Sequence, residues 1–343
     1  MAKKKSRKGN MSRFLGTVVN KGLTDRIQEK RKCKRSSCRV YASNLRRINK
    51  EFSGKPFTIN LSWLHADAKR ILDKIKKLAN VNQQRNFVSS ALVGFDLLKD
   101  AENKEIFNQY LKKLNAKKAE MQRSGEMTSK QKAKYIDWKE ILKLRRLLGR
   151  EVNLARLYTR ADVTRKDFLK IQRYLLLSLL TELPPTRNDY ADVQIISEKD
   201  FNKLSKKNSD NFLVTARGGY KLYWRRYKTA RTYGQILVFI PKHSKSLQRL
   251  LVKHIKYLRK HFPQNTALLL NQNFGSLSRN ALTKYLQRMF KQYFKKSIST
   301  TMLRQIFLTS KYNKKELEEQ QETSRLMGHS MKTQIADYIK KTD

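Results

Sequence analysis

Apolar residues recur every three or four positions through much of the chain, which predicts a mainly helical protein. The first such pattern begins near Ser62, with apolar residues at Leu64, Ala68, Ile71, Leu72, Ile75 and Leu78. Similar stripes follow over residues 87–98, 106–114 and 141–148. We therefore predict a helical bundle over residues 56–150. A polar stretch from Met121 to Lys134 predicts a loop within it.

The second half of the chain changes in character after an apolar helical stretch over residues 168–180. That stretch ends before Pro184-Pro185, because proline cannot continue a helix. Three strand-like segments follow, with glycines at or near the turns between them: Asn211–Thr215, Tyr220–Tyr227 and Gln235–Ile240. They predict a small antiparallel sheet. Helical stripes return over residues 247–258 and 282–290, so residues 151–343 are predicted to form a mixed α+β domain.

The first 50 residues carry 17 Lys or Arg and two acids, with few large apolar residues in a regular period. Such a composition is typical of a segment that orders only on a polyanion, so residues 1–55 are predicted to be a basic, flexible tail. The runs Lys3-Lys4-Lys5 and Lys30–Arg35 also fit nuclear localisation signals. The predicted fold class is thus mainly α with one small antiparallel β-sheet.

The charge balance indicates the kind of partner. The 343 residues contain 77 Lys and Arg against 28 Asp and Glu, a formal net charge of +49. A folded chain of this charge repels itself unless a polyanion is near, and nucleic acid is the polyanion we expect. A membrane-surface binder, a ribosomal component or a packaging protein would have the same balance. No apolar run reaches the ~20 residues that span a bilayer, so we expect an intracellular protein without a membrane partner.

The only two cysteines are Cys33 and Cys38, inside the basic tail. Two cysteines do not make a disulfide framework, and we predict that none is used. A zinc site is not predicted either, because no second Cys or His pair lies nearby and the closest histidine is His65.

The C-terminal segment carries the most specific motif. Leu326-Met327-Gly328-His329-Ser330 is followed by Tyr338, nine positions after the histidine. This spacing, with a Leu-Arg pair upstream in a predicted helix, resembles the signature of tyrosine recombinases and phage integrases. The resemblance implies a helical core-binding domain followed by a catalytic domain of that family's type. It makes Tyr338 the nucleophile and His329 a catalytic residue.

The same resemblance assigns the remaining catalytic positions across residues 153–343. Arg304 matches the family's second catalytic arginine, and Thr301 stands where the family has a histidine. Arg187, which follows the helix and Pro184-Pro185, matches the first arginine. Lys228, in the predicted hairpin, matches the catalytic lysine, with Lys221 as the alternative.

These residue types suit the chemistry of a phosphodiester. Two guanidiniums, Arg187 and Arg304, can each present paired donors to oxygens whose charge increases in the transition state, and His329 would add another donor. A phenol has a pKa of about 10, so Tyr338 needs a strongly positive pocket to react as phenolate. Lys228 could protonate the leaving 5′ oxygen. Thr301 cannot take the tyrosine proton, so the proton acceptor is left open.

The resemblance also implies a clamp around double-stranded DNA and a homotetramer on that DNA, with no metal and no small-molecule cofactor. The predicted DNA contacts are Arg85, Lys221, Arg225, Arg226 and Arg231. Only five residues follow Tyr338, fewer than in many relatives, so the coupling between subunits is left open.

Two other functions remain compatible with the sequence. A type IB topoisomerase would use the same chemistry to relax supercoils, and a non-catalytic basic DNA-binding protein could retain the fold. The Pro-Pro-x-Arg-Asn-Asp motif at Pro184–Asp189 resembles recombinases of large DNA viruses and their mobile elements. If that resemblance holds, the location would be a host nucleus, a viral factory or a virion.

Overall fold

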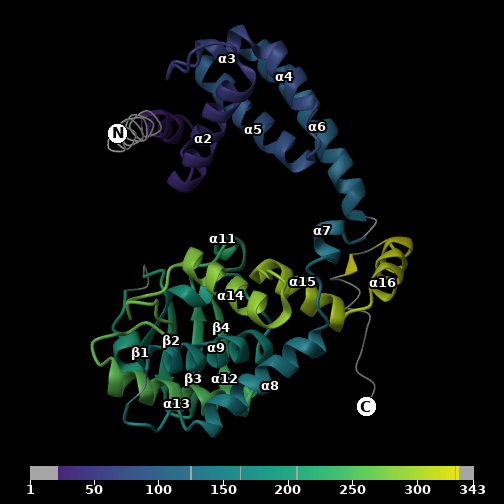
Figure 1. The fold of residues 1–343 in the computed structure, drawn as a ribbon. Coiled ribbons are helices and arrows are strands. Elements are labelled where there is room, and N and C mark those ends of the chain that lie inside the picture. The colour runs from purple at the N-terminus through teal and green to yellow at the C-terminus, as the bar shows by residue number, and fades with distance from the viewer. Residues whose placement is uncertain (1–21, 124–125, 163, 206–207, 329, 332–343) are drawn as a thin grey trace, which may run out of the picture. The chain divides into compact units, whose positions relative to one another are not determined.

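The computed structural model describes residues 22–123, 126–162, 164–205, 208–328 and 330–331. The chain divides into two compact units, with the boundary between Glu126 and Met127 (Figure 1). The predicted fold class is confirmed, since the described residues are mostly helical with one small sheet. Each unit has its own hydrophobic core and is considered by itself.

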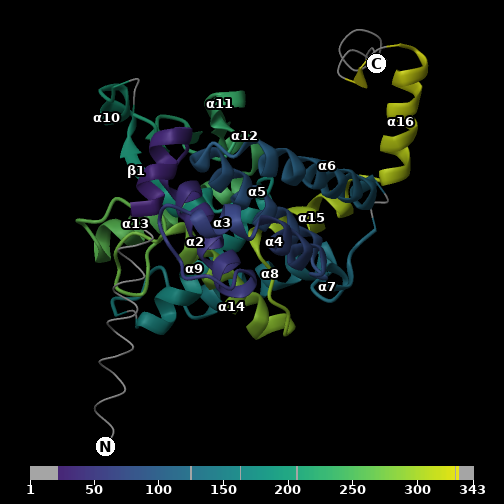
Figure 2. The ribbon, with the colours of Figure 1, turned by 90° about the horizontal axis from the view of Figure 1, so that it is seen from above.

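The first unit is a helical bundle built around α5 (Val81–Leu98), which contacts α2, α3, α4 and α6 (Figures 1 and 2). Its helices are residues 22–31, α2 (Arg35–Phe52), α3 (Ser62–Ala66), α4 (Ala68–Lys76), α5 and α6 (Ala101–Arg123). Gly94 lets α5 approach α3, because a Cβ there would lie 2.4 Å from Leu64 Cδ2. The Asn80 side chain caps the start of α5 by accepting from the backbone N–H of Asn82 at 2.9 Å.

The prediction of a flexible tail over residues 1–55 was wrong for residues 22–52. Helical residues 22–31 and α2 pack into the first core, where Leu23, Ile27, Leu45 and Ile48 are fully buried. The buried residues of α2 recur every three or four positions, but many basic residues on its outer face made this pattern hard to recognise in the sequence. Residues 1–21 lie outside the described part of the chain.

The cysteine prediction was also wrong. Cys33 and Cys38 form a disulfide between the helical residues 22–31 and α2. The two positions are only five residues apart, so this bond closes one local turn and needs no larger framework of cysteines. Cys38 itself is fully buried in the first core.

The second unit contains a four-stranded sheet in the order β1-β2-β3-β4. Strands β2 (Asn211–Ala216), β3 (Gly219–Trp224) and β4 (Ile236–Phe239) are antiparallel neighbours, as predicted. An additional strand, β1 (Val193–Ser197), pairs in parallel with β2 and makes the sheet mixed. Arg217 and Gly218 form the tight turn between β2 and β3, and both Gly218 and the first residue of β3, Gly219, have positive φ.

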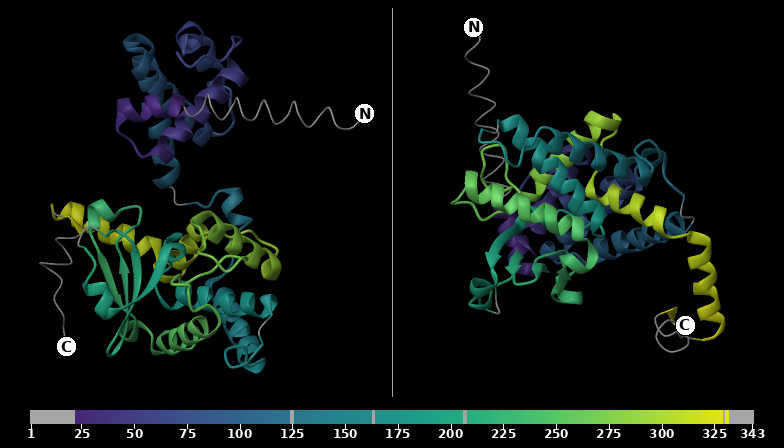
Figure 3. Two further views of the ribbon diagram at one scale, coloured as in Figure 1. Left: turned by 90° about the vertical axis from the view of Figure 1, so that its left-hand side faces the viewer. Right: turned by 90° about the horizontal axis from the view of Figure 1, so that it is seen from below.

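The helices of this unit surround α9 (Arg165–Glu182), whose residues Leu175–Leu180 are buried. Helices α8 (Trp138–Leu154) and α13 (Lys245–His261) both contact α9. Figures 1 and 3 show α8 and α13 on one side of the unit and α11 and α14 on the opposite side. The remaining elements are α7 (Ser129–Lys132), η1 (Asp189–Asp192), α10 (Glu198–Asn202), α11 (Ala230–Tyr233), α12 (Ile240–His243), α14 (Arg279–Phe294), α15 (Thr300–Lys311) and α16 (Lys314–Leu326).

The predicted domain boundary at residue 150 falls inside α8 and was wrong. Leu144 and Leu148 of α8 belong to the core of the second unit, so the division lies before this helix. The predicted loop over residues 121–134 is shorter than expected. Helix α6 extends to Arg123, and α7 occupies part of the remainder.

A buried amide joins α9 to the chain segment after α13. Gln172 is 1% exposed; it donates to the backbone carbonyl of Leu270 at 2.9 Å and accepts from the Leu270 N–H at 2.7 Å. These bonds satisfy two backbone groups that have no water nearby. They fix the end of a strand-like segment that packs on α9.

We expect Gln172→Ala to lower the free energy of unfolding of the second unit by about 3 kcal/mol, because it leaves a buried donor and a buried acceptor unpaired. Urea denaturation followed by tryptophan fluorescence measures this loss. Gln320→Ala on α16 is the matched control, because Gln320 is exposed. Equal effects of the two substitutions would contradict the role given to the buried amide.

Candidate active site

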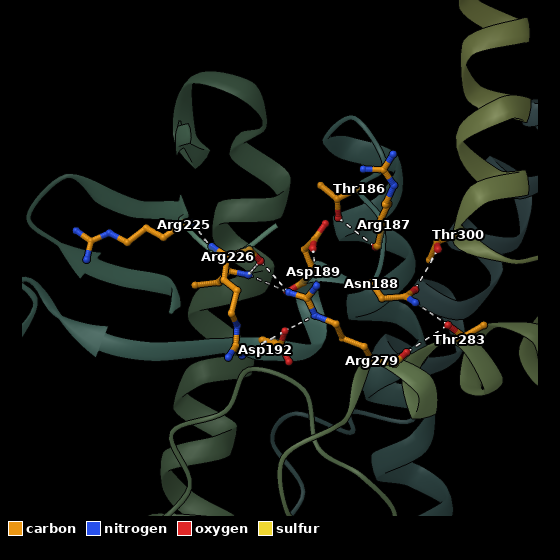
Figure 4. Close-up of polar contacts among 11 residues, drawn as sticks. Thr186, Arg187, Asn188, Asp189, Asp192, Arg225, Arg226, Arg279, Thr283 and Thr300 are labelled. Atoms are coloured by element: carbon orange, nitrogen blue, oxygen red, sulfur yellow. Dashed lines mark hydrogen bonds and ion pairs between the residues drawn. The ribbon is translucent and has the colours of Figure 1, made fainter. Parts of the chain in front are cut away.

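The loop after α9 presents Arg187 and is held by the residue that follows it. Asn188 donates from Nδ2 to Thr283 Oγ1 of α14 at 2.7 Å. Its Oδ1 accepts from Thr300 Oγ1, the first residue of α15, at 3.0 Å (Figure 4). One amide therefore ties the Arg187 loop to two helices that lie about a hundred residues later in the sequence.

Arg304 lies on α15, four residues after Thr300. Residues four apart share one face of an α-helix and are separated by about 6 Å along its axis. Because Thr300 faces the Arg187 loop through Asn188, Arg304 extends from the same side of α15. The structure thus brings the backbone segments that carry the two predicted arginines together. Thr301, the position that departs from the family, is exposed.

A cluster of ion pairs lies beneath this loop. Arg279, the first residue of α14, pairs with Asp189 at 3.4 Å and with Asp192, both in η1 (Figure 4). Its Nη2 also donates to the backbone carbonyl of Arg226 at 2.7 Å. Arg226 in turn pairs with Asp192 at 3.3 Å and with Asp210 at 3.4 Å. Arg279 therefore links the segment after Arg187 to the segment before Lys228.

The carboxyl group of Asp189 depends on its cationic neighbours. Burial raises the pKa of Asp189, while Arg279 and Arg187 act in the opposite direction. The side chain is nearly buried, so loss of a neighbouring guanidinium would leave a poorly solvated negative charge. This carboxylate holds Arg279 in place and is itself stabilised by the positive charge of the site.

Lys228 lies in the short segment between β3 and α11, whose two ends are fixed. The fully buried Asn211 side chain accepts from the N–H of Arg226 at 2.8 Å and donates to its carbonyl at 3.1 Å. The Tyr227 hydroxyl donates to the carbonyl of Gly234 at 2.7 Å, which closes the segment. The side chain of Lys228 is exposed. The backbone around this lysine is therefore held while its ammonium group is directed to solvent.

Among the described residues, no acidic side chain forms an ion pair with Arg187, Lys228 or Arg304. Arg187 is nevertheless close enough to Asp189 to oppose the rise in the pKa of that carboxyl. In Figure 4 the guanidinium of Arg187 points away from Arg279 and Asp192. The nearby acids Asp189 and Asp192 are instead paired with Arg279 and Arg226. The arrangement leaves positive charge and free donors for an external anion, and a phosphate group has the matching charge and geometry.

The residues predicted to contact DNA differ in what they bind within the protein. Arg225 donates to Gln235 Oε1 at 2.6 Å and lies over the ring of Phe201, and Arg226 has the ion pairs above. Lys221 pairs with Glu198 at 2.7 Å, a hydrogen bond that raises the pKa of the lysine. Arg231, on α11, is exposed. The pairing of Lys221 favours Lys228 over this alternative as the catalytic lysine.

In the first unit, Arg85 lies on α5 and donates from Nε to Asn115 Oδ1 of α6 at 2.8 Å. This bond leaves its two terminal nitrogens for other acceptors. The contact with DNA stays a prediction.

Two predicted catalytic residues, His329 and Tyr338, lie outside the described residues. The fully buried Tyr190, close in sequence to Arg187, cannot replace Tyr338 as a nucleophile. Its hydroxyl donates to the carbonyl of Leu179 at 3.2 Å, and burial raises its pKa. Tyr233 and Tyr312 are exposed, at 70% and 49% of their surface.

Sequence reasoning missed the residues that organise this site. Arg279 is one of many basic residues, and Asn188 and Asn211 are polar residues in or near predicted turns. Nothing in their local pattern distinguishes them. The motif around Pro184-Pro185 contains Asn188 and Asp189. It therefore identified the segment, but it did not predict what these two side chains bind.

We also searched the described part of the chain for metal-binding groups and for membrane-spanning helices. It contains no group of three or more His, Cys, Asp or Glu side chains arranged to hold a metal ion. None of its helices combines the length and apolar character of a membrane span.

Comparison with known proteins gives similarity at the level of structure. No family model matches the sequence, and no curated protein matches it. Among solved structures, the chain is similar to XerH site-specific recombinase in a post-cleavage complex with palindromic difH substrate. The TM-score is 0.46 and the identity 16%, over 92% of this chain and 79% of that chain. A pre-cleavage complex of XerH with difH gives a TM-score of 0.46 and 14% identity, over 94% and 85% of the respective chains. The description of the candidate site therefore relies on the contacts and distances within this chain.

Proposed function

We propose that this protein is a site-specific DNA recombinase that cleaves and rejoins strands through a covalent 3′-phosphotyrosine at Tyr338. The observation that carries the proposal is the link between the Arg187 loop and the start of α15 through Asn188. Two guanidiniums extend from segments that this amide joins, and neither forms an ion pair with an acidic side chain of the described residues. A site for one phosphodiester requires that combination.

The proposed first step is attack by the Tyr338 oxygen on phosphorus. The new bond joins that oxygen to phosphorus, and the bond from phosphorus to the deoxyribose 5′ oxygen breaks. Arg187 and Arg304 stabilise the charge that develops on the non-bridging oxygens, and Lys228 donates a proton to the leaving oxygen. Attack by the 5′ hydroxyl of a second strand reverses these changes, so rejoining needs no external energy source.

Removal of the tyrosine proton is assigned to a group other than Thr301. A threonine hydroxyl is too weak a base at neutral pH, and Thr301 is exposed on α15. The positive charge of Arg187, Arg304 and Lys228 lowers the free energy of a phenolate in the site, so water or His329 can accept the proton. The homotetramer and the clamp of two domains around duplex DNA belong to the same proposal.

Tyr338→Phe should abolish covalent capture of a nicked suicide duplex while the affinity for duplex DNA changes less than about twofold, because only the attacking oxygen is removed. Denaturing gel electrophoresis of labelled DNA detects the covalent complex. Tyr312→Phe is the matched control, since Tyr312 is an exposed tyrosine of the same unit.

Other outcomes would favour the competing functions. Covalent capture that survives Tyr338→Phe but is lost in Tyr312→Phe or Tyr233→Phe would assign another nucleophile. Relaxation of a supercoiled plasmid without a recombination site would indicate a topoisomerase. If the wild-type protein forms no covalent complex on any target duplex, it is a non-catalytic DNA-binding protein.

Arg304→Lys should slow the cleavage step by about a hundredfold, because lysine keeps the charge but loses the planar pair of donors. The rate is measured in single-turnover assays at saturating protein. Arg249→Lys is the control, because Arg249 of α13 is an exposed arginine of the same unit to which no role in DNA binding is assigned. A loss of DNA affinity with an unchanged single-turnover rate would show that Arg304 serves binding alone.

Asn188→Ala should slow single-turnover cleavage by about tenfold, because the Arg187 loop loses its bonds to α14 and α15. The dissociation constant for duplex DNA and the melting temperature should change little, since Asn188 is a positioning residue. Asn273→Ala, at an exposed asparagine of the same unit, is the control. A fall in melting temperature with an unchanged cleavage rate would argue against positioning.

A further inference from the structure

Two cavities form a groove between α8 and α13. Figures 1 and 3 show these two helices on the side of the second unit opposite α11 and α14. One cavity, of about 900 Å³, lies between the end of α8 and the second half of α13; the other, of about 510 Å³, lies between α8, α9 and the start of α13. Asn153 lines both cavities, so they form one continuous depression.

Cations line both sides of this groove. Lys253, Lys256 and Lys260 follow one another along α13 at spacings of three and four residues, which places them on one face. Arg146 and Arg150 do the same on α8. All five are exposed, and no acidic side chain among the described residues pairs with any of them. The acid that lines the groove, Glu182, is paired with Arg145 at 2.9 Å.

The spacing of the lysines suits a chain of phosphates. Lys253 and Lys260 are separated by about 10.5 Å along the helix axis. This length is on the scale of a few successive phosphates of an extended strand, so the three lysines can each contact a phosphate of one strand.

Tyrosine rings line the same groove between the cations. Tyr174 of α9 lines the smaller cavity and is partly exposed. Tyr158 lines the larger cavity, but its hydroxyl is buried and its ring packs edge-on against the buried His254 and Tyr257, so Tyr174 is the ring that a base can reach. Gly149 of α8 makes room for Tyr174, because a Cβ at this position would lie 2.8 Å from Tyr174 Cε2. Cations that follow a backbone, together with aromatic rings that accept bases, are the features of sites for single-stranded nucleic acid.

We propose that the α8–α13 groove binds a single strand of nucleic acid, with phosphates on Lys253, Lys256 and Lys260 and a base against Tyr174. A duplex fits less well, because its bases are stacked inside and its phosphates would meet only the rim of the groove. The groove lies away from Arg187 and Lys228, so a strand can occupy it while duplex DNA occupies the candidate active site. The proposal does not depend on strand cleavage.

The test measures binding of a fluorescent 12-nucleotide oligothymidine to the full-length protein by anisotropy. Excess unlabelled duplex is present throughout, so that other DNA-binding surfaces are occupied. The variant Lys253→Gln, Lys256→Gln, Lys260→Gln should bind the strand about tenfold more weakly, and the slope of log affinity against log salt should fall by about 2 in magnitude. Its melting temperature establishes that the variant is folded.

A second triple variant separates a specific groove from a general effect of charge. Lys284→Gln, Arg288→Gln, Lys291→Gln removes the same charge from α14, around a cavity of about 230 Å³ without a tyrosine. It should leave binding of the strand unchanged within twofold. Equal losses in the two triple variants, or no binding of the strand in the presence of duplex, would overturn the proposal.

An abasic oligonucleotide of the same length tests the contact with Tyr174. It should bind several-fold more weakly than oligothymidine, because each stacked base contributes about 1–3 kcal/mol. Equal binding of the two strands would show a site for phosphates alone and would overturn the part of the proposal that concerns bases. Inorganic tripolyphosphate that displaces the oligonucleotide at equal phosphate concentration would lead to the same conclusion.

Discussion

The ion pairs of Arg279 with Asp189 and Asp192 hold together the segments on which the candidate site depends. Asp189 and Asp192 are the first and last residues of η1, directly after the Arg187 loop, and Arg279 also binds the backbone two residues before Lys228. Burial raises the pKa of Asp189, so this carboxylate is stable only beside a cation. Without Arg279, a buried charge would be left uncompensated and two loops would lose their common anchor. The positions of the candidate catalytic residues Arg187 and Lys228 therefore depend on Arg279, which is bound by acids of the protein itself.

Neutral side chains make the connections closest to the proposed phosphate. Asn188 joins the Arg187 loop to Thr283 and Thr300, and Asn211 fixes the backbone of Arg226 from within the sheet. An amide offers both donors and an acceptor without adding negative charge. A carboxylate in the place of Asn188 could accept the same bond from Thr300 but would reduce the positive charge beside Arg187. The site is thus held rigid by amides near the anion and by ion pairs further below it.

Sequence patterns predicted the elements whose signals are local, and missed those that depend on distant partners. The hairpin of β2 and β3 followed from β-prone segments around Gly218-Gly219. Strand β1 was missed because it is short and is defined by parallel pairing with β2. Helix α2 was missed because its five basic residues are as numerous as its five buried residues, which include the small or polar Cys38, Ala42 and Asn49. In the candidate site, a motif located Arg187 and Arg304, whereas the roles of Asn188 and Arg279 depend on contacts across roughly a hundred residues. His329 and Tyr338 stay predictions from the motif.

In a chain with 77 basic and 28 acidic residues, most cations must lack an acidic partner, so an unpaired lysine by itself indicates nothing. The positions of the acids are more informative. Glu182 pairs with Arg145, and Asp192 pairs with Arg279 and Arg226, in each case between helices or loops that must be held together. These two acids therefore hold cations that connect separate elements of the fold. Unpaired cations that gather around a concave surface without an acid to neutralise them repel one another most strongly. Binding of an external polyanion at such a surface relieves the most repulsion and is therefore the most favourable. The α8–α13 groove meets this condition, because the acid that lines it, Glu182, is already paired with Arg145.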